Sequence, residues 1–208
     1  MKIEVSRLRV RRGSRWVLDG VEFAPEPGRV TWVRGPNGCG KSTLLATLAG
    51  ELAGEGSVTI DGRDVSRWGV ADRQRAGVRW LPQGPSLIDG LSATENLAMG
   101  MDRAPARQAL VGVGLDPTSS MPVGRLSGGE RRRVEMARAL TGGGVLLLDE
   151  PLAGIDVAWR SPLWNRILSR ATAGATVVIV DHGLEDLASV DVIRWNLGSS
   201  AVGTATSD

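Results

Sequence analysis

The chain has 208 residues, of which 42% are hydrophobic and 23% charged, as in a globular protein built on one α/β domain. Its single cysteine, Cys39, excludes an internal disulfide and any metal site built from several cysteines. The net charge is only +2 and the longest apolar runs are far too short to span a bilayer, so composition favours neither a nucleic-acid binder nor an integral membrane protein.

Residues 3–23 predict an antiparallel hairpin. Apolar and polar side chains alternate from Ile3 to Arg11, which is typical of a half-buried strand. Residues 12–15 are predicted to turn, and residues 16–23 to supply the partner strand. Arginines gather in this hairpin and again at residues 131–133, and we interpret both groups as solvated faces of a strand and a helix.

The next stretch matches the phosphate-binding pattern G-x-x-x-x-G-K-[ST]. It runs from Gly35 to Thr43, after a short apolar strand at residues 30–33 and before an apolar run that predicts an amphipathic helix. Its glycines allow successive backbone N–H groups to surround phosphate oxygens, and the helix dipole adds positive potential. We therefore expect Lys41 to bind the β- and γ-phosphates of a nucleotide and Ser42 to bind Mg²⁺.

The rest of the chain alternates strands with helices, which predicts a mostly parallel sheet with flanking helices behind the antiparallel N-terminal section. Continuous apolar runs at residues 145–148 and 175–180 are typical of strands buried on both faces. Glycine, proline and short helical pieces dominate residues 84–125, which predicts a small helical insertion. The other expected elements are strands at residues 57–60, 78–81 and 193–195 and helices beginning near residues 93, 105, 128 and 159. We expect the small, polar tail from Gly198 to be loose.

Polar side chains stand at the ends of three predicted strands. Asp149 and Glu150 follow one strand, Gln83 follows another and His182 follows a third. Ligands of open parallel sheets bind at the carboxyl ends of the strands, so these residues are expected beside the phosphate loop. There Asp149 can hold Mg²⁺, Glu150 can activate a water, Gln83 can bind the metal or a water, and His182 can contact the γ-phosphate.

A second anion-binding design lies in Leu126-Ser127-Gly128-Gly129-Glu130. Ser127 is a good N-cap, and the two glycines after it leave backbone N–H groups uncovered at a helix N-terminus. A flexible entrance to a helix explains the same residues, and the pattern alone does not decide between the two interpretations.

With the helix that follows it, this segment resembles the signature of ATP-binding-cassette (ABC) ATPases, and the other motifs of that family occur in the family's order. They are Walker A at residues 35–43, the Q-loop at Gln83, Walker B at residues 145–149 with Glu150, the D-loop around Asp156 and the switch histidine at His182. The resemblance covers nearly the whole chain. It implies a single domain over residues 1–208 with a P-loop NTPase core, RecA-like, into which a helical subdomain at residues 84–140 is inserted.

The resemblance also implies the function. Such cassettes bind and hydrolyse ATP with Mg²⁺, and they work as homodimers or heterodimers in which ATP lies between Walker A of one subunit and the signature of the other. They power a separate membrane permease, so we expect a cytoplasmic protein, peripheral on the inner face of the membrane, with no direct contact to nucleic acid. The implied catalytic residues are Glu150, His182 and Lys41, and the implied metal ligands are Ser42, Gln83 and Asp149. The implied nucleotide contacts are Arg12, Asn37, Gly38, Cys39, Gly40, Lys41, Ser42, Thr43, Gln83, Ser127, Gly128 and Gly129.

The resemblance leaves some questions open. Arg12 stands where the family usually has an aromatic residue that stacks on adenine, so selectivity for ATP over GTP stays undecided. A soluble cassette protein that acts on nucleic acid or ribosomes is an alternative function, although those relatives carry two cassettes or added modules. A module that holds ATP without turnover is a third, which the presence of Glu150 disfavours. The transported substrate and its direction cannot be read from the sequence.

Overall fold

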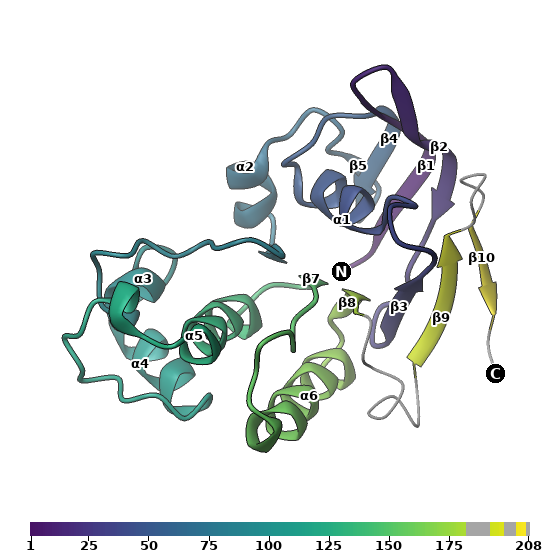
Figure 1. Ribbon diagram of the computed structural model, residues 1–208. Helices are drawn as coiled ribbons and strands as arrows, with labels where there is room; N and C mark the ends of the chain where they lie inside the picture. Colours follow the sequence, from purple (N-terminus) through teal and green to yellow (C-terminus); the bar gives the residue numbers. More distant parts are fainter. Residues whose placement is uncertain (182–191, 198–202, 207–208) are drawn as a thin grey trace.

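Two β-sheets and the helix between them form the larger part of the molecule (Figure 1). The computed structural model describes residues 1–181, 192–197 and 203–206. One sheet is antiparallel, in the order β2-β1-β4-β5, with strands Ile3–Arg12 (β1), Arg15–Phe23 (β2), Glu55–Ile60 (β4) and Arg63–Asp64 (β5). The other has the order β10-β9-β3-β8-β7-β6, with strands Val30–Arg34 (β3), Val78–Leu81 (β6), Val145–Asp149 (β7), Thr176–Val180 (β8), Val192–Leu197 (β9) and Gly203–Thr206 (β10).

The second sheet is parallel except for β10, which runs antiparallel to β9. Strands β7 and β8 are buried along their whole length, as their unbroken apolar sequences predict. Because β7 and β8 are parallel, their carboxyl ends meet at one edge of the sheet, where Asp149, the last residue of β7, and Glu150 lie. The predicted fold, a P-loop NTPase core with an antiparallel N-terminal section and a small group of helices, is confirmed.

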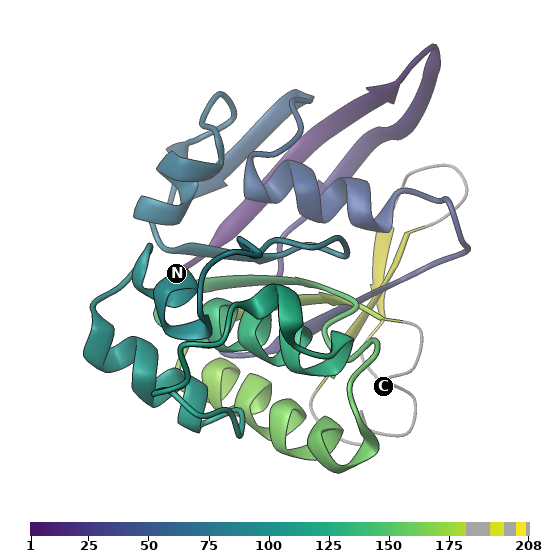
Figure 2. The same cartoon turned by 60° about the vertical axis from the view of Figure 1, so that its left-hand side comes forward.

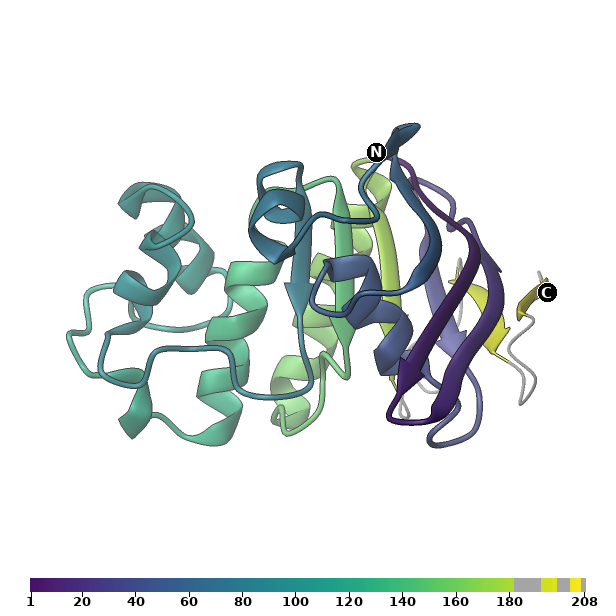
Figure 3. The ribbon, with the colours of Figure 1, turned by 90° about the horizontal axis from the view of Figure 1, so that it is seen from above.

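Helix α1, Lys41–Ala49, lies between the two sheets (Figures 2 and 3). All of its residues except Ser42 are buried, and Leu44, Leu45 and Leu48 join the apolar cluster that both sheets share. The predicted helix is present, but the prediction that it is amphipathic is wrong, because a helix covered by a sheet on either side has no solvated face. This packing fixes the direction in which its N-terminus points.

The remaining helices cover the parallel sheet or extend away from it. They are α2 (Val70–Arg75), α3 (Ala93–Ala98), α4 (Arg103–Val111), α5 (Gly128–Leu140) and α6 (Val157–Thr172), with a 3₁₀ turn at Val123–Arg125. Helices α3 and α4 pack on α5 at the end of the molecule farthest from the antiparallel sheet (Figure 1). Ser92 and Glu95 form a capping box at the start of α3, as the sequence predicts. Among the described helices, none is both long and apolar enough to cross a membrane.

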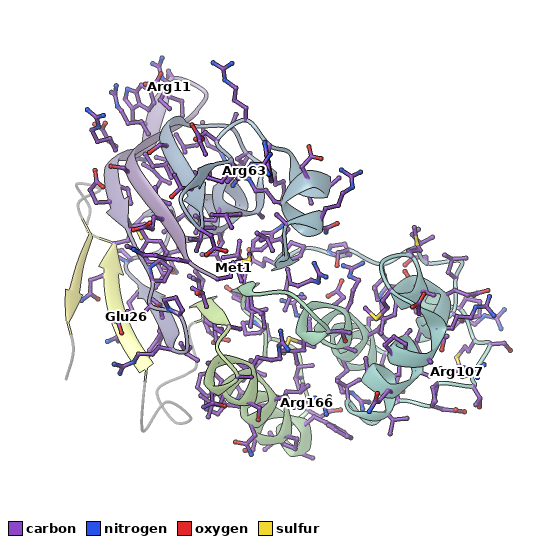
Figure 4. All side chains as sticks on the ribbon, turned by 180° about the vertical axis from the view of Figure 1, so that it is seen from behind. Met1, Arg11, Glu26, Arg63, Arg107 and Arg166 are labelled. Carbon is purple, nitrogen blue, oxygen red and sulfur yellow. The ribbon has the colours of Figure 1, made fainter. Side chains whose placement is uncertain are left out.

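Two further expectations from the sequence need correction, and two short elements are not indicated by it. Residues 203–206, within the tail that was expected to be loose, form β10 beside β9. Arg132 and Arg133, expected on a solvated face, are each only 8% exposed. Helix α2 and the short strand β5 carry no strong pattern in the sequence and were not predicted. The arginines of the hairpin, by contrast, are mostly exposed, and Figure 4 shows Arg11 near its end.

Candidate functional site

The loop between β3 and α1 has a backbone that only glycine allows at two positions. Gly35 and Gly40 have φ angles of 149° and 107°. A β-carbon at Gly35 would lie 2.6 Å from the carbonyl oxygen of Leu197, and one at Gly40 would lie 2.7 Å from Cδ2 of Leu18. The fixed glycines of the phosphate-binding pattern are thus required both for the turn and for the close approach of neighbouring strands.

The side chain of Lys41 folds back onto this loop. Its side-chain Nζ donates hydrogen bonds to the carbonyl oxygens of Gly35, at 2.8 Å, and Pro36, at 3.0 Å. The residue is only 7% exposed, so these two carbonyls replace the water that the ammonium group loses. A phosphate group can take the place of the carbonyls, which gives the ammonium group a full negative charge as its partner.

A pocket of about 410 Å³ opens over this loop. Gln83, which follows β6, and Glu150, which follows β7, line it opposite the start of α1. The other lining residues are Val17, Asn37, Gly38, Gly40, Lys41, Ser42, Thr43 and Val180. The structure therefore brings Gln83 and Glu150 to the phosphate loop, from sequence positions far apart, because their strands are neighbours in the parallel sheet.

Asp149 at the end of β7 is the most buried acidic group of this site, with 2% exposure. Burial raises the pKa of its carboxyl, while a hydrogen bond from Ser42 acts in the opposite direction. Its Oδ1 has no hydrogen-bond partner in the part of the chain that the structure describes. A buried carboxylate oxygen without a partner, beside the hydroxyl of Ser42, suits a hard divalent cation such as Mg²⁺.

Glu150 has an unusual backbone. Its φ angle is 47°, in the left-handed region, and its N–H donates to the carbonyl oxygen of Val180 at 2.7 Å. A residue other than glycine keeps this conformation only where its surroundings hold it. Arg132 supplies part of that support, since its Nη2 donates to the carbonyl oxygens of Asp149, at 2.6 Å, and Glu150, at 2.9 Å. The sequence does not indicate Arg132 as a residue of the site, because it stands in a run of three arginines that resembles a solvated face.

The second predicted anion-binding segment, at the N-terminus of α5, does not line this pocket. Ser127 is the N-cap of α5, and its hydroxyl and N–H both bond to the carboxylate of Glu130, at 2.7 and 2.9 Å. Among the described residues that line the pocket, Ser127, Gly128 and Gly129 do not appear. The phosphate loop and the N-terminus of α5 are therefore separate sites within one subunit.

Asp149, Cys39 and Arg12 are also predicted site residues that do not belong to the pocket lining. Cys39 lies within the loop and is partly buried, with its sulfur close to Gly35. Arg12 is exposed in the hairpin, paired across the turn with Arg15. The ring of nearby Trp16 is already covered by guanidinium groups of Arg9 and Arg11, at 4.0 and 4.8 Å from its centre. His182 lies outside the described residues.

Comparisons with known proteins agree with the fold. The sequence model of the family described as "ABC transporter" matches residues 18–153. The chain is 41% identical over 191 residues to the hemin import ATP-binding protein HmuV of Streptomyces coelicolor, covering 85% of this chain and 68% of that protein. It is 37% identical over 201 residues to HmuV of Pseudomonas aeruginosa, covering 88% and 77%. A nucleotide-free ATP-binding cassette from an ABC transporter has the same fold, with a TM-score of 0.86 and 24% identity over 99% of this chain and 91% of that one.

Proposed function

Because the chain belongs to the ABC transporter family, as an ATP-binding and ATP-hydrolysing subunit, we propose that the pocket over the phosphate loop is its hydrolysis site. The observation that carries this proposal is the unpartnered carboxylate oxygen of Asp149, buried beside Ser42. In the proposed site Ser42, Asp149 and Gln83 would hold Mg²⁺. The metal would neutralise phosphate charge and orient the γ-phosphate for attack.

The roles of the other residues follow from their places around the pocket. Lys41 exchanges the carbonyls of Gly35 and Pro36 for the β- and γ-phosphates. Backbone N–H groups from Asn37 to Thr43 surround the phosphate oxygens. Glu150 orients the attacking water and accepts its proton, an effect worth about 10²- to 10⁴-fold in rate. We assign His182 to the γ-phosphate, as the family resemblance implies, and Arg12 to the face of the base.

We propose that turnover needs a second subunit, identical or different. The phosphate loop and the N-terminus of α5 are separate anion sites in one chain, so a head-to-tail pair would place each loop against the partner's signature segment. Ser127, Gly128 and Gly129 then contact the nucleotide held by the other subunit. This arrangement uses both sites of each chain and closes the open side of the pocket.

A membrane permease is the proposed working partner, which places the protein at the inner face of the membrane. A groove of about 440 Å³ lies where the helical part, residues 84–140, meets the parallel sheet. Its lining is basic and partly apolar: Ala71, Gln74, Arg75, Arg79, Trp80, Gly100, Met101, Arg138 and Ala139. We propose this groove as the docking position of the permease. The names of the HmuV relatives favour import of hemin as the transport step.

Replacing Glu150 with glutamine tests the hydrolysis site. Glu150→Gln keeps the shape of the side chain but removes the base, so ATP still binds, turnover falls by at least about a hundredfold and an ATP-bound dimer accumulates. Glu26→Gln, an exposed glutamate far from the pocket, is the matched control and should hydrolyse ATP at the normal rate. Normal turnover by Glu150→Gln would overturn the assignment.

The transport step is tested separately. Deleting the gene should stop its host from growing with hemin as the iron source, and the Glu26→Gln variant but not Glu150→Gln should restore growth. Unchanged growth of the deletion strain would refute the cargo and leave the hydrolysis site standing. Co-purification with ribosomes or DNA, and with no membrane protein, would instead support a non-transport function.

A further inference from the structure

One face of α5 carries a strip of three charged side chains, of which two are buried and the third is partly exposed. Arg132, Glu135 and Arg138 follow each other at intervals of three residues, so they lie on the same side of the helix. Nη1 of Arg132 lies 2.9 Å from Oε2 of Glu135, and the two side chains are only 9% and 7% exposed. Burying a charged group costs free energy unless the group is hydrogen-bonded or paired. The hydrogen-bond partners of these side chains therefore show which parts of the molecule they connect.

Arg132 holds the catalytic end of the strip. In addition to the carbonyls of Asp149 and Glu150, its guanidinium donates from Nη1 to the carbonyl oxygen of Pro82 at 2.9 Å. Pro82 directly precedes Gln83. One side chain therefore joins the loop that carries Gln83 to the backbone of Glu150, in which the φ angle is 47°. Any shift of that loop changes the bonds that hold Glu150 in its left-handed conformation.

Arg138 holds the other end, at the groove. Its Nη1 and Nη2 donate to the carbonyl oxygen and to Oγ of Ser86, at 2.8 and 2.6 Å. Ser86 in turn donates from its N–H and its hydroxyl to Oε1 of Glu135, at 2.8 and 2.9 Å. Arg138 is also part of the lining of the groove. Hydrogen bonds thus run without a gap from the groove to the backbone of Glu150.

We propose that Arg132, Glu135, Arg138 and Ser86 form a relay that couples the state of the groove to the position of Glu150. This inference rests on the proposed function of Glu150 and of the groove. The relay residues are positioning residues, since they hold backbone and do not line the nucleotide pocket. A partner that binds the groove and moves Arg138 or Ser86 would act on Glu150 through bonded side chains of α5 and through Ser86, which lies in the loop after β6.

The two ends of the relay can be tested by a double-mutant cycle in the full chain. Arg132→Gln and Arg138→Gln should each lower kcat for ATP by about ten- to a hundredfold, because small displacements of a catalytic group have effects of this size. Affinity for Mg·ADP, measured by calorimetry, should change by less than about twofold, since Lys41 and the loop are intact. The double variant should be no slower than the slower single variant.

Arg133→Gln is the matched control on the same helix. Arg133 is as buried as Arg132, at 8% exposure, but it donates to the carbonyls of Val113 and Gly114, away from the pocket. Its loss should leave kcat within about twofold, and its effect should simply multiply with that of Arg132→Gln. If Arg132→Gln does not fold, Arg132→Lys, which keeps the charge but reaches fewer carbonyls, takes its place in the cycle.

Two results would overturn the relay. One is a double variant whose loss in kcat is the product of the two single losses, because independent sites multiply. The other is an equal loss in Arg132→Gln and Arg133→Gln, which would show a general effect of disturbing α5. If the assignment of Glu150 as the catalytic base is itself wrong, the result is different: Glu150→Gln then hydrolyses ATP at the normal rate, whatever the outcome of the double-mutant cycle.

Discussion

The side-chain Nζ of Lys41 lies 2.8 Å from the carbonyl oxygen of Gly35, six residues before it in the same loop. The carbonyl oxygens of the loop therefore hold the ammonium group of Lys41. A bound phosphate would offer this group charged acceptors in place of neutral ones. We therefore expect the attraction between charges to supply most of the free energy of phosphate binding, which makes Lys41 the first residue to test.

Lys41→Met should abolish the stabilisation that Mg·ADP gives. A ligand at a hundred times its Kd adds about 2.7 kcal/mol to the free energy of unfolding, which raises Tm by about 5 to 10 °C in a chain of this size. Differential scanning calorimetry of the variant should show almost no shift. A shift as large as in the unaltered protein would mean that Lys41 does not bind the phosphates.

Asp149→Asn should stabilise the nucleotide-free protein at neutral pH. Burial raises the pKa of Asp149 in the folded state, so ionisation opposes folding, and the stability of the protonated form is lost as pH rises from the unfolded pKa through the folded one. The variant should gain stability over the unaltered protein above that window and lose the advantage below about pH 4, near the unfolded pKa. Urea unfolding at several pH values measures this difference.

The same variant should lose the effect of Mg²⁺. In the unaltered protein Mg²⁺ with ADP should raise stability further than ADP alone, while in Asp149→Asn the metal should add almost nothing. An equal response to Mg²⁺ in both proteins would place the metal elsewhere.

Arg73→Met should be strongly destabilising. Arg73 is 1% exposed and donates to the carbonyls of Thr47, Leu48 and Val65, at 2.6, 2.7 and 2.9 Å, which ties α2 to the C-terminus of α1. Removal leaves these buried acceptors without donors, at a cost of about 3 to 5 kcal/mol in the free energy of unfolding. The exposed Arg75, paired with Asp72, is the control, and Arg75→Met should cost less than about 1 kcal/mol in the same urea titration.

Alkylation of Cys39 should block nucleotide binding. The chain has one cysteine, so modification occurs at a single position. Its sulfur lies against Gly35 at the base of the loop, and a bulky group there would displace the backbone that surrounds the phosphates. N-ethylmaleimide should abolish binding of Mg·ADP, and saturating Mg·ADP should slow the modification. Full ATPase activity in a completely alkylated sample would contradict this.

Arg12→Ala should weaken binding of ATP by about two- to fivefold if its guanidinium stacks on the base, since exposed stacking contacts contribute about 0.5 to 1 kcal/mol. Arg15→Ala is the control, because Arg15 is the exposed arginine opposite Arg12 in the hairpin. Fluorescence titrations with ATP and GTP measure both variants. Equal effects of the two substitutions would show only the loss of a positive charge.

Much of the fold was predictable because its signals are local. The alternation of residues 3–11, the apolar strands β7 and β8 and the capping box of α3 each follow from neighbouring side chains and backbone sterics. The phosphate loop is predictable for the same reason: Gly35 and Gly40 are required by φ angles within the loop itself. The burial of helix α1 is an exception. Its sequence is compatible with one solvated face, and that face is buried only because a second sheet packs on it.

The kind of chemistry in this site can be read from the amino-acid sequence, because the residue types of Lys41, Ser42, Asp149 and Glu150 and their motif spacing suffice to indicate a phosphate and metal site. How these groups are held in place depends on long-range packing. The left-handed backbone of Glu150 and the burial of Arg132 arise from contacts between β6, β7 and α5, which are far apart in sequence. A run of three arginines looks the same in sequence whether water or carbonyl oxygens surround it, and the packing of α5 makes that choice.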